Sequence, residues 1–149
     1  MANAAAILEP VGALLLGRGT FEAFAESWPM RSGDPYTDKM NAMPKYVASR
    51  TLTEASWNGT VLGEDVAGEV RRLKEQTEGD LLKFGTGQLD ATLLQNGLLD
   101  ELHLWVFPVI VGSGQRVLDG VIGTMHLHLL GSTSLASGIV IHRYAPKAS

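Results

Sequence analysis

The stretch Leu81-Leu82-Lys83-Phe84-Gly85-Thr86-Gly87-Gln88-Leu89 decides the fold, because an apolar run passes directly into a glycine turn and then into a helix-like segment. This order predicts a strand, a tight turn and a helix N-terminus. Glycine lets the backbone approach a ligand closely, and the first-turn N–H groups of a helix attract anions. The turn therefore fits a phosphate-binding corner, although glycine at a strand-to-helix turn is also ordinary turn chemistry.

A dinucleotide-binding Rossmann fingerprint does not fit this corner. The pattern Gly-x-Gly-x-x-Gly would need glycine where Asp90 stands, and it normally opens the first strand–helix unit of a chain. This corner comes late in the sequence. Whether this corner binds a phosphate therefore has to be judged together with the other strand ends of the chain.

Two earlier strand ends carry cationic turns. The apolar run 13–16 leads into Gly17-Arg18-Gly19-Thr20, and the run 46–48 leads into Ser49-Arg50-Thr51. Arginine and hydroxyl side chains bind phosphate oxygens through strong hydrogen bonds. Three corners, two of them with arginine, predict a ligand with several phosphates.

The ordered series of motifs resembles the dihydrofolate reductase-like family, and within it the RibD C-terminal reductase domain. The motifs are Leu14-Leu15-Leu16-Gly17-Arg18-x-Thr20-Phe21-Glu22, Met43-Pro44-Lys45-Tyr46-Val47-Ala48-Ser49-Arg50-Thr51-Leu52, Gly85-Thr86-Gly87-Gln88-Leu89, Asp100-Glu101-Leu102 and Pro108-Val109-Ile110-Val111-Gly112-Ser113-Gly114. The resemblance covers nearly the whole chain from about Ala13 onward. It implies a single domain over residues 1–149 with a three-layer α/β/α fold, a mixed and partly parallel central sheet, and a C-terminal antiparallel hairpin.

The resemblance also implies a reduced nicotinamide cofactor, NADPH. Ser49 and Arg50 are expected to contact the phosphate on the adenosine ribose, with Lys45 as an alternative, and the glycine corner is expected to meet the pyrophosphate. Arg18 and Thr20 also have simpler explanations, since Arg18 can bond turn carbonyls and Thr20 can cap its helix. The candidate cofactor-binding residues are Gly17, Arg18, Thr20, Ser49, Arg50, Gly85, Thr86, Gly87 and Gln88.

The chain departs from the family at its beginning. Family members usually open with a strand and a Ser-Leu-Asp-Gly-like turn, whose acidic residue often lies beside the substrate pocket. The short segment before Ala13 contains no such turn. We therefore expect an N-terminally shortened relative, a first strand supplied by another chain, or catalysis by different groups. Glu9, Glu22 and Asp38 are available carboxylates, but the sequence assigns a catalytic role to none of them.

Composition fits one small α/β domain. The 149 residues are 45% hydrophobic, which is enough to bury one substantial core. A formal net charge of −4 with scattered basic residues argues against a nucleic-acid surface. The absence of cysteine excludes disulfides and thiolate chemistry. No apolar stretch is long enough to span a bilayer and the start lacks a secretory signal, so we expect a cytoplasmic protein without a membrane partner.

Periodicity and turn residues predict alternating strands and helices, with helices on both faces of a mixed sheet. One helix is expected to have Thr20 as its N-cap and to end near Trp28, followed by a loop from Met30 to Asp38. Asp65 is expected to cap the next helix, and a further helix is expected over 88–95. The expected strands are 13–16, 46–49, 61–62, 81–84, 101–111, 125–130 and 139–144.

The histidine and serine motifs do not predict a metal centre or a serine nucleophile. His126 and His128 would project from one face of a strand, but metal centres usually need three or four ligands. Ser113 lacks the strand–turn–helix context of an esterase-type nucleophile. We therefore expect no metal.

The leading functional hypothesis is an NADPH-dependent reductase that transfers hydride to a heterocyclic or ribosylamino-pyrimidine-type substrate, as the resemblance implies. The cofactor carries the hydride chemistry, so the sequence says less about the substrate than about the cofactor. The alternative is a noncatalytic nucleotide-binding or oligomer-forming relative that has lost its first strand and acidic turn.

The apolar C-terminal hairpin predicts self-association, because it would leave more strand edge and apolar face than a small monomer should expose. RibD-like reductases commonly pair through their C-terminal strands, so the resemblance also implies at least a homodimer. Candidates for core or interface are Leu127, Leu129, Ile139 and Ile141, with His126 and His128 expected on the opposite face.

Overall fold

The computed structural model describes residues 8–85, 87–118, 120–121 and 123–147. The chain forms two compact units, Met1–Gly85 and Thr86–Ser149. The assignment of residues 1–149 to a single domain stays a prediction. Residues 1–7, which include most of the segment expected to be shortened, lie outside the described residues.

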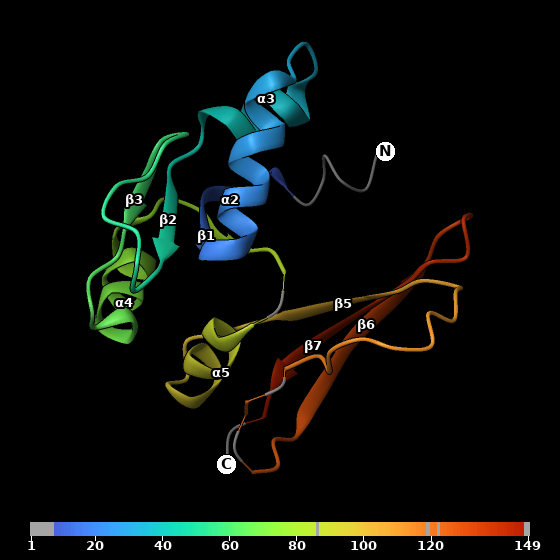
Figure 1. The fold of residues 1–149 in the computed structure, drawn as a ribbon. Helices are drawn as coiled ribbons and strands as arrows, with labels where there is room; N and C mark the ends of the chain where they lie inside the picture. Colours follow the sequence, from blue (N-terminus) through green and yellow to red (C-terminus); the bar gives the residue numbers. More distant parts are fainter. Residues whose placement is uncertain (1–7, 86, 119, 122, 148–149) are drawn as a thin grey trace. The chain divides into compact units, whose positions relative to one another are not determined.

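The first unit is built on a parallel four-stranded sheet with the order β3-β2-β1-β4 (Figure 1). β1 pairs with β2 on one side and with β4 on the other, and its leucines 14–16 are at most 2% exposed. A central parallel strand is covered on both faces, which explains why this run is continuously apolar. The strands are β1 (Val11–Gly17), β2 (Lys45–Ala48), β3 (Gly59–Val61) and β4 (Asp80–Lys83).

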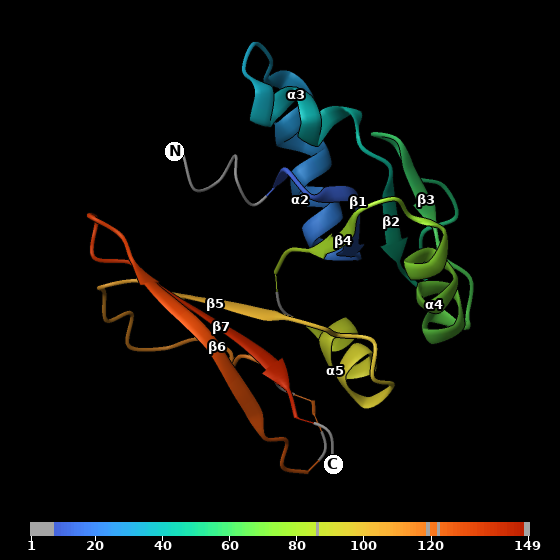
Figure 2. The ribbon, with the colours of Figure 1, turned by 180° about the vertical axis from the view of Figure 1, so that it is seen from behind.

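Helices of the first unit cover both faces of this sheet. The β1-to-β2 and β3-to-β4 connections cross the sheet in opposite directions, so right-handed crossovers place their helices on opposite faces (Figures 1 and 2). Leu14, Leu16 and Val47 form the core with Phe21 and Met40. The helices are α2 (Arg18–Ser27), the 3-10 helix η1 (Trp28–Met30), α3 (Pro35–Ala42) and α4 (Val66–Gln76).

Two expectations about these helices are wrong. The first helix begins at Arg18, directly after the strand, so Thr20 lies inside its first turn and Gly17 occupies the N-cap position. Residues 30–38 are not all loop, because α3 begins at Pro35. Its N-cap is Asp34, whose carboxylate accepts the Thr37 N–H at 2.9 Å. Proline is common at the first position of a helix, but in a stretch rich in Pro, Gly and Asp it was interpreted as loop. The cap expected at Asp65 is confirmed.

The described residues of the second unit form one helix and a three-stranded antiparallel sheet with the order β5-β7-β6. Helix α5 (Gln88–Gln95) and the antiparallel C-terminal hairpin are confirmed. The α/β fold with a parallel and an antiparallel part is therefore also confirmed, and the described strands hydrogen-bond as two sheets. The strands are β5 (Leu102–Val106), β6 (Leu127–Ser134) and β7 (Val140–Pro146). Among the described residues, no helix is long and apolar enough to cross a membrane.

The strand expected over 101–111 is wrong in its second half, because β5 ends at Val106. Pro108 carries no backbone N–H to donate to a neighbouring strand. Val109, Ile110 and Val111 are 65%, 97% and 77% exposed. The apolar run 101–111 therefore predicted a strand that continues beyond Val106, but the residues after Val106 are exposed and do not extend β5.

The hairpin register divides the expected interface candidates between two faces. Leu129 pairs with Tyr144, so both lie on a face that we call the leucine face, formed by Leu102, Leu104, Val106, Leu127, Leu129, Val140, His142 and Tyr144. Ile141 pairs with Trp105 and therefore lies on the opposite face. His128 pairs with Ala145 and shares that opposite face. His128 thus lies opposite Leu129, as expected, but the grouping of Ile141 with Leu129 was wrong.

A buried lysine ties together several loops at the amino end of β2. Lys45 is 0% exposed, and its Nζ lies 3.9 Å from the centroid of the Trp57 ring. The Lys45 Nζ donates to Asn41 O at 2.9 Å, and the Trp57 indole N–H donates to Asn41 Oδ1 at 2.7 Å. Asn41 Nδ2 donates to the carbonyl of Trp28 at 3.1 Å. Asn41 therefore holds the end of α2, the start of β2 and the Trp57 turn in one polar network.

Burial lowers the pKa of Lys45 from the ordinary 10.5 to about 8. Between these values the unfolded chain binds a proton that the folded chain has released, so the free energy of unfolding rises with pH. Each pKa unit corresponds to about 1.4 kcal/mol, which gives a rise of up to about 3 kcal/mol. We expect urea unfolding to show this rise from about pH 7.5 to about pH 9.5, below the ordinary titration of tyrosine. The Lys45→Met variant should lose the rise, and an equal rise in both proteins would contradict the assignment.

Candidate functional site

Three strand ends of the first unit meet at one edge of its parallel sheet. β1 ends at Gly17, β2 at Ala48 and β4 at Lys83, and Gly17 is the register partner of Ala48. Open α/β sheets bind ligands outside the carboxyl ends of their strands, where the strand order reverses. The order reverses at β1, since the chain proceeds outward to β3 and returns to β4 on the other side. All candidate residues of this unit lie at or directly after these strand ends. They are Gly17, Arg18, Thr20, Ser49, Arg50 and Gly85.

A guanidinium and two hydroxyls form a cluster at this edge. Arg18 Nη1 donates to Thr51 Oγ1 at 3.2 Å, and Thr51 Oγ1 lies 3.4 Å from Ser49 Oγ. Ser49 Oγ also accepts the backbone N–H of Thr51 at 3.2 Å and of Leu52 at 3.0 Å. These bonds make a serine turn that fixes the hydroxyl directly after β2. We call this group the Arg18–Ser49–Thr51 cluster.

The cluster has the chemistry of a phosphate site. Arginine presents a planar fork of N–H donors that matches phosphate oxygens, and two hydroxyls add neutral donors beside it. Arg50 is exposed next to Ser49 and adds a second cation to the same turn. Lys45, the alternative cation, is buried at the other end of β2, so it does not present its ammonium at this edge.

Gly85 is required by the structure of the first unit. Its φ of +81° lies in the left-handed region, where side chains are strained. A Cβ at this position would lie 2.8 Å from Thr20 Oγ1. The structure therefore places Gly85 against Thr20. The backbone conformation of the turn and this close contact explain the glycine at position 85 without a ligand.

The rest of the glycine corner belongs to the second unit. Thr86 lies outside the described residues, and Gln88 is the exposed first residue of α5. Gly87 is extended, with φ 172°, and among the described residues no atom beyond its two chain neighbours lies within 4 Å of a Cβ built on it. The described part of the second unit therefore does not require glycine at position 87. The Gly87 N–H is not free, because it donates to Asp90 Oδ2 at 2.8 Å.

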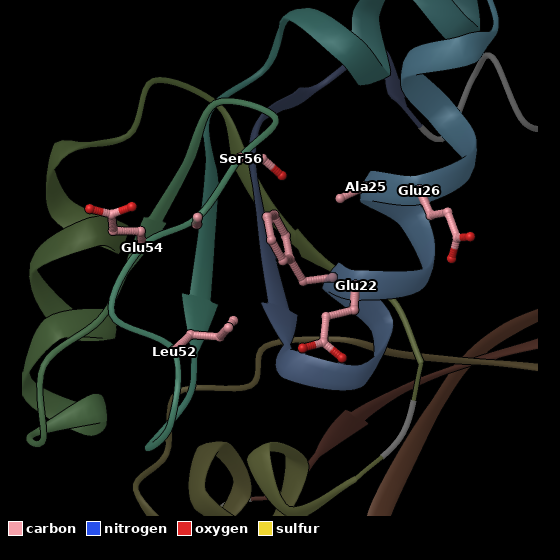
Figure 3. Close-up of a pocket in the computed structure, with 8 residues that line it drawn as sticks. Glu22, Ala25, Glu26, Leu52, Glu54 and Ser56 are labelled. Atoms are coloured by element: carbon pink, nitrogen blue, oxygen red, sulfur yellow. The ribbon is translucent and has the colours of Figure 1, made fainter.

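A separate hollow of about 350 Å³ lies between α2 and the segment 52–56. Figure 3 shows the carboxylates of Glu22, Glu26 and Glu54 pointing away from one another around it. They do not converge on one point, and their negative charge makes the hollow unsuited to a phosphate. The lining residues are Phe21, Glu22, Ala25, Glu26, Leu52, Glu54, Ala55 and Ser56.

The carboxylates considered as proton donors remain without a catalytic role. Glu22 lines this hollow, and Asp38 accepts the Gly33 N–H at 3.2 Å. In the part of the chain that the structure describes, no group of three or more histidine and carboxylate side chains is placed to hold a metal.

Two residues of these corners were not among the candidate cofactor-binding residues. Thr51 bonds both Arg18 and Ser49, and a Ser-x-Thr sequence directly after a strand could have indicated the turn that positions it. Asp90 caps the start of α5, which an acidic residue in a first helical turn could have indicated.

A model of the RibD C-terminal domain family matches residues 2–141 of the chain. The uncharacterized protein YyaP of Bacillus subtilis (strain 168) is 28% identical over 138 residues, which span 89% of this chain and 73% of that protein. The family match therefore extends over both units.

Solved structures of low sequence identity share the fold. A putative riboflavin biosynthesis protein from Shewanella sp. PV-4 superposes with a TM-score of 0.76 at 20% identity, covering 96% of this chain and 78% of that one. A dihydrofolate reductase from Enterococcus faecalis, solved in complex with NADP(H), superposes with a TM-score of 0.66 at 13% identity, covering 99% and 83%. These likenesses identify a dihydrofolate reductase-like fold.

The contrast between Gly85 and Gly87 leads to a test of the corner. We expect Gly87→Val to stay folded, since its backbone is extended and unobstructed, and to lose NADPH binding because the side chain fills the approach to the backbone. Gly85→Ala should lower the melting temperature, because a left-handed residue with a close contact costs about 1–3 kcal/mol. Circular dichroism and NADPH titration measure both effects. Normal NADPH binding by folded Gly87→Val would leave the corner as a structural turn only.

Proposed function

Because this chain belongs to the RibD C-terminal domain family, we propose that it is an NADPH-dependent reductase that transfers hydride to a heterocyclic or ribosylamino-pyrimidine-type substrate. The family match supports an oxidoreductase function at the level of the family. The cofactor, the substrate class, a role in riboflavin biosynthesis and a cytoplasmic location are the further parts of the proposal.

The observation that carries the proposal is the Arg18–Ser49–Thr51 cluster at the carboxyl edge of β1 and β2. A phosphate on the adenosine ribose distinguishes NADPH from NADH, and this cluster offers charged and neutral donors to such a group. Arg50 extends the same positive turn. An acidic residue at the ribose-binding position of a Rossmann fingerprint would favour NADH, and the sequence has no acidic residue in that register.

The protein's own residues would bind and orient the cofactor through their hydrogen-bond donors and positive charge. When bound, a reduced nicotinamide supplies the hydride. Arg18, Ser49 and Thr51 of the first unit would hold the distinguishing phosphate. For the second unit by itself, Gly87 stays the predicted contact of the pyrophosphate. Anchoring of the distant phosphate fixes the orientation of the reacting ring, which is a large part of what the protein contributes to hydride transfer.

Calorimetry with NADPH and NADH tests the cofactor assignment. NADPH should bind more tightly than NADH. Hydrogen bonds to charged groups contribute about 1.5–3 kcal/mol, so Arg50→Ala and Arg18→Ala should each weaken NADPH by about tenfold to a hundredfold and change NADH little. Arg71→Ala is the matched control, because it removes an exposed arginine from α4 in the same unit.

Equal losses for the two cofactors, or an equal effect of the Arg71 control, would contradict the assignment. Oxidation of NADPH by candidate pyrimidine or pteridine substrates, followed at 340 nm, separates the reductase from the alternative. Tight NADPH binding without turnover of any such substrate would favour a noncatalytic nucleotide-binding relative.

We also propose that the chain forms a homodimer through the leucine face of its second unit. This face carries half-buried leucines on two strands, and its residues Val106 and Leu129 are 51% and 54% exposed. The opposite face contains Ile141, which is 8% exposed and belongs to the interior of the folded chain. A two-fold contact buries the same patch of both subunits, so one substitution is introduced twice.

Leu129→Asp should therefore convert a dimer into a folded monomer of 16.0 kDa in light scattering. His128→Asp, on the opposite face, is the matched control and should leave the dimer intact. Ile141→Asp should instead unfold the protein, because it places a charge in a buried position. A monomeric wild-type protein at micromolar concentration would contradict the dimer, and dissociation by His128→Asp alone would assign the contact to the other face.

A further inference from the structure

The sequence contains two Asn-Gly pairs, at 58–59 and at 96–97. Asparagine before glycine is prone to deamidation, because the backbone nitrogen of the next residue attacks the side-chain amide and glycine has no side chain to obstruct the attack. A folded structure slows this reaction where it prevents the backbone from rotating toward the amide. The two pairs lie in different units, and the structure holds them with different firmness.

The Asn58–Gly59 pair is locked into the turn that starts β3. The Gly59 N–H donates to Ser56 O at 2.8 Å, and Asn58 O accepts the backbone N–H of Lys45 at 3.1 Å. Asn58 Nδ2 donates to Asn41 O at 3.0 Å. A Cβ built on Gly59 would lie 2.8 Å from Ser56 O, so the backbone is tightly packed here. Rotation of the pair would break these hydrogen bonds and detach the start of β3 from β2.

The Asn96–Gly97 pair lies in open surroundings at the end of α5. Asn96 is the exposed C-cap residue, and its Nδ2 donates to Thr92 O at 2.8 Å. The Gly97 N–H donates to Leu94 O at 3.3 Å, which is longer than the usual bond of about 2.7–3.2 Å. Among the described residues, no atom beyond its chain neighbours lies within 4 Å of a Cβ built on Gly97. The attacking nitrogen is therefore weakly held and unobstructed.

We propose that Asn96 is a site of spontaneous deamidation and that the fold protects Asn58. The Gly97 backbone nitrogen gives its proton to hydroxide and bonds to Asn96 Cγ. The bond from Cγ to Nδ2 breaks, so ammonia leaves and a cyclic succinimide forms. Water then opens the ring at one of its two carbonyls, which gives aspartate or isoaspartate. One water is consumed and one ammonia is released, and nothing is oxidised or reduced.

Either product weakens the end of α5. The last turn of a helix carries partial negative charge, so a new carboxylate is disfavoured there. The lost amide was a donor to Thr92 O, one of the last carbonyls of the helix. Isoaspartate also lengthens the backbone inside the turn that Leu98 closes by donating its N–H to Leu93 O at 2.9 Å. Leu93 and Leu98 are 3% and 8% exposed, so the disturbance reaches buried side chains.

Peptide mass mapping of the folded wild-type protein, sampled during incubation at mildly alkaline pH, tests the proposal. Enzymatic methylation of isoaspartate identifies that product. Asn96 should react faster than Asn58 by about tenfold or more, because each hydrogen bond that must open lowers the reactive population by about twofold to tenfold. In guanidinium chloride the two pairs should react at similar rates, since the unfolded chain holds neither.

Three variants test the product and its consequence. Asn96→Gln should abolish conversion at this position, because its longer side chain forms the cyclic intermediate less readily. Asn96→Asp reproduces one product directly and should lower the melting temperature. Gln115→Glu is the matched control, because it makes the same amide-to-carboxylate change at an exposed position of the second unit, and it should leave the melting temperature unchanged.

Reaction at Asn58 that equals or exceeds reaction at Asn96 in the folded protein would overturn the proposal. A folded protein that leaves Asn96 intact, over a time in which the unfolded chain reacts at both pairs, would overturn it too. Equal loss of stability in Asn96→Asp and Gln115→Glu would contradict the proposed effect on α5.

Discussion

The parallel pairing of β1 with both β2 and β4 is the constraint on which the candidate site depends. Parallel strands place their carboxyl ends at the same edge, so turns that are far apart in sequence become neighbours. This pairing brings Arg18 to Thr51 and sets Gly85 against Thr20. The pairing in turn requires a strand buried on both faces, which the leucines 14–16 provide. A single polar substitution in that run would disturb the core and the site together.

The charges of the first unit are separated along its strands. Arg18 and Arg50 lie at the carboxyl edge, where both side chains are exposed to solvent and to a ligand anion. Lys45 lies at the amino end of β2, where burial against Trp57 and Asn41 uses its ammonium to organise loops. The same strand thus begins with a structural cation and ends beside a candidate binding cation, and their exposure distinguishes the two roles.

The sequence predicted the elements whose signal is local and strong. The helix over 88–95, the cap at Asp65 and the glycine at position 85 all follow from residues next to one another. Errors arose where local patterns compete with the rest of the chain. The apolar run beyond Val106 did not continue as strand, because apolar residues indicate burial and Pro108 cannot extend a hydrogen-bond ladder. The face of Ile141 depended on hairpin register, and the bond from Arg18 to Thr51 depended on strand pairing, neither of which single residues encode.

The central claim is that the Arg18–Ser49–Thr51 cluster holds the 2′ phosphate of a reduced nicotinamide cofactor. A crystal structure of the protein with bound NADPH tests this claim most directly. The account predicts the 2′ phosphate within hydrogen-bonding distance of Ser49 Oγ and Thr51 Oγ1, with the guanidinium of Arg18 turned from Thr51 toward the phosphate. An adenosine phosphate bound elsewhere, with the Arg18–Thr51 bond intact, would contradict it.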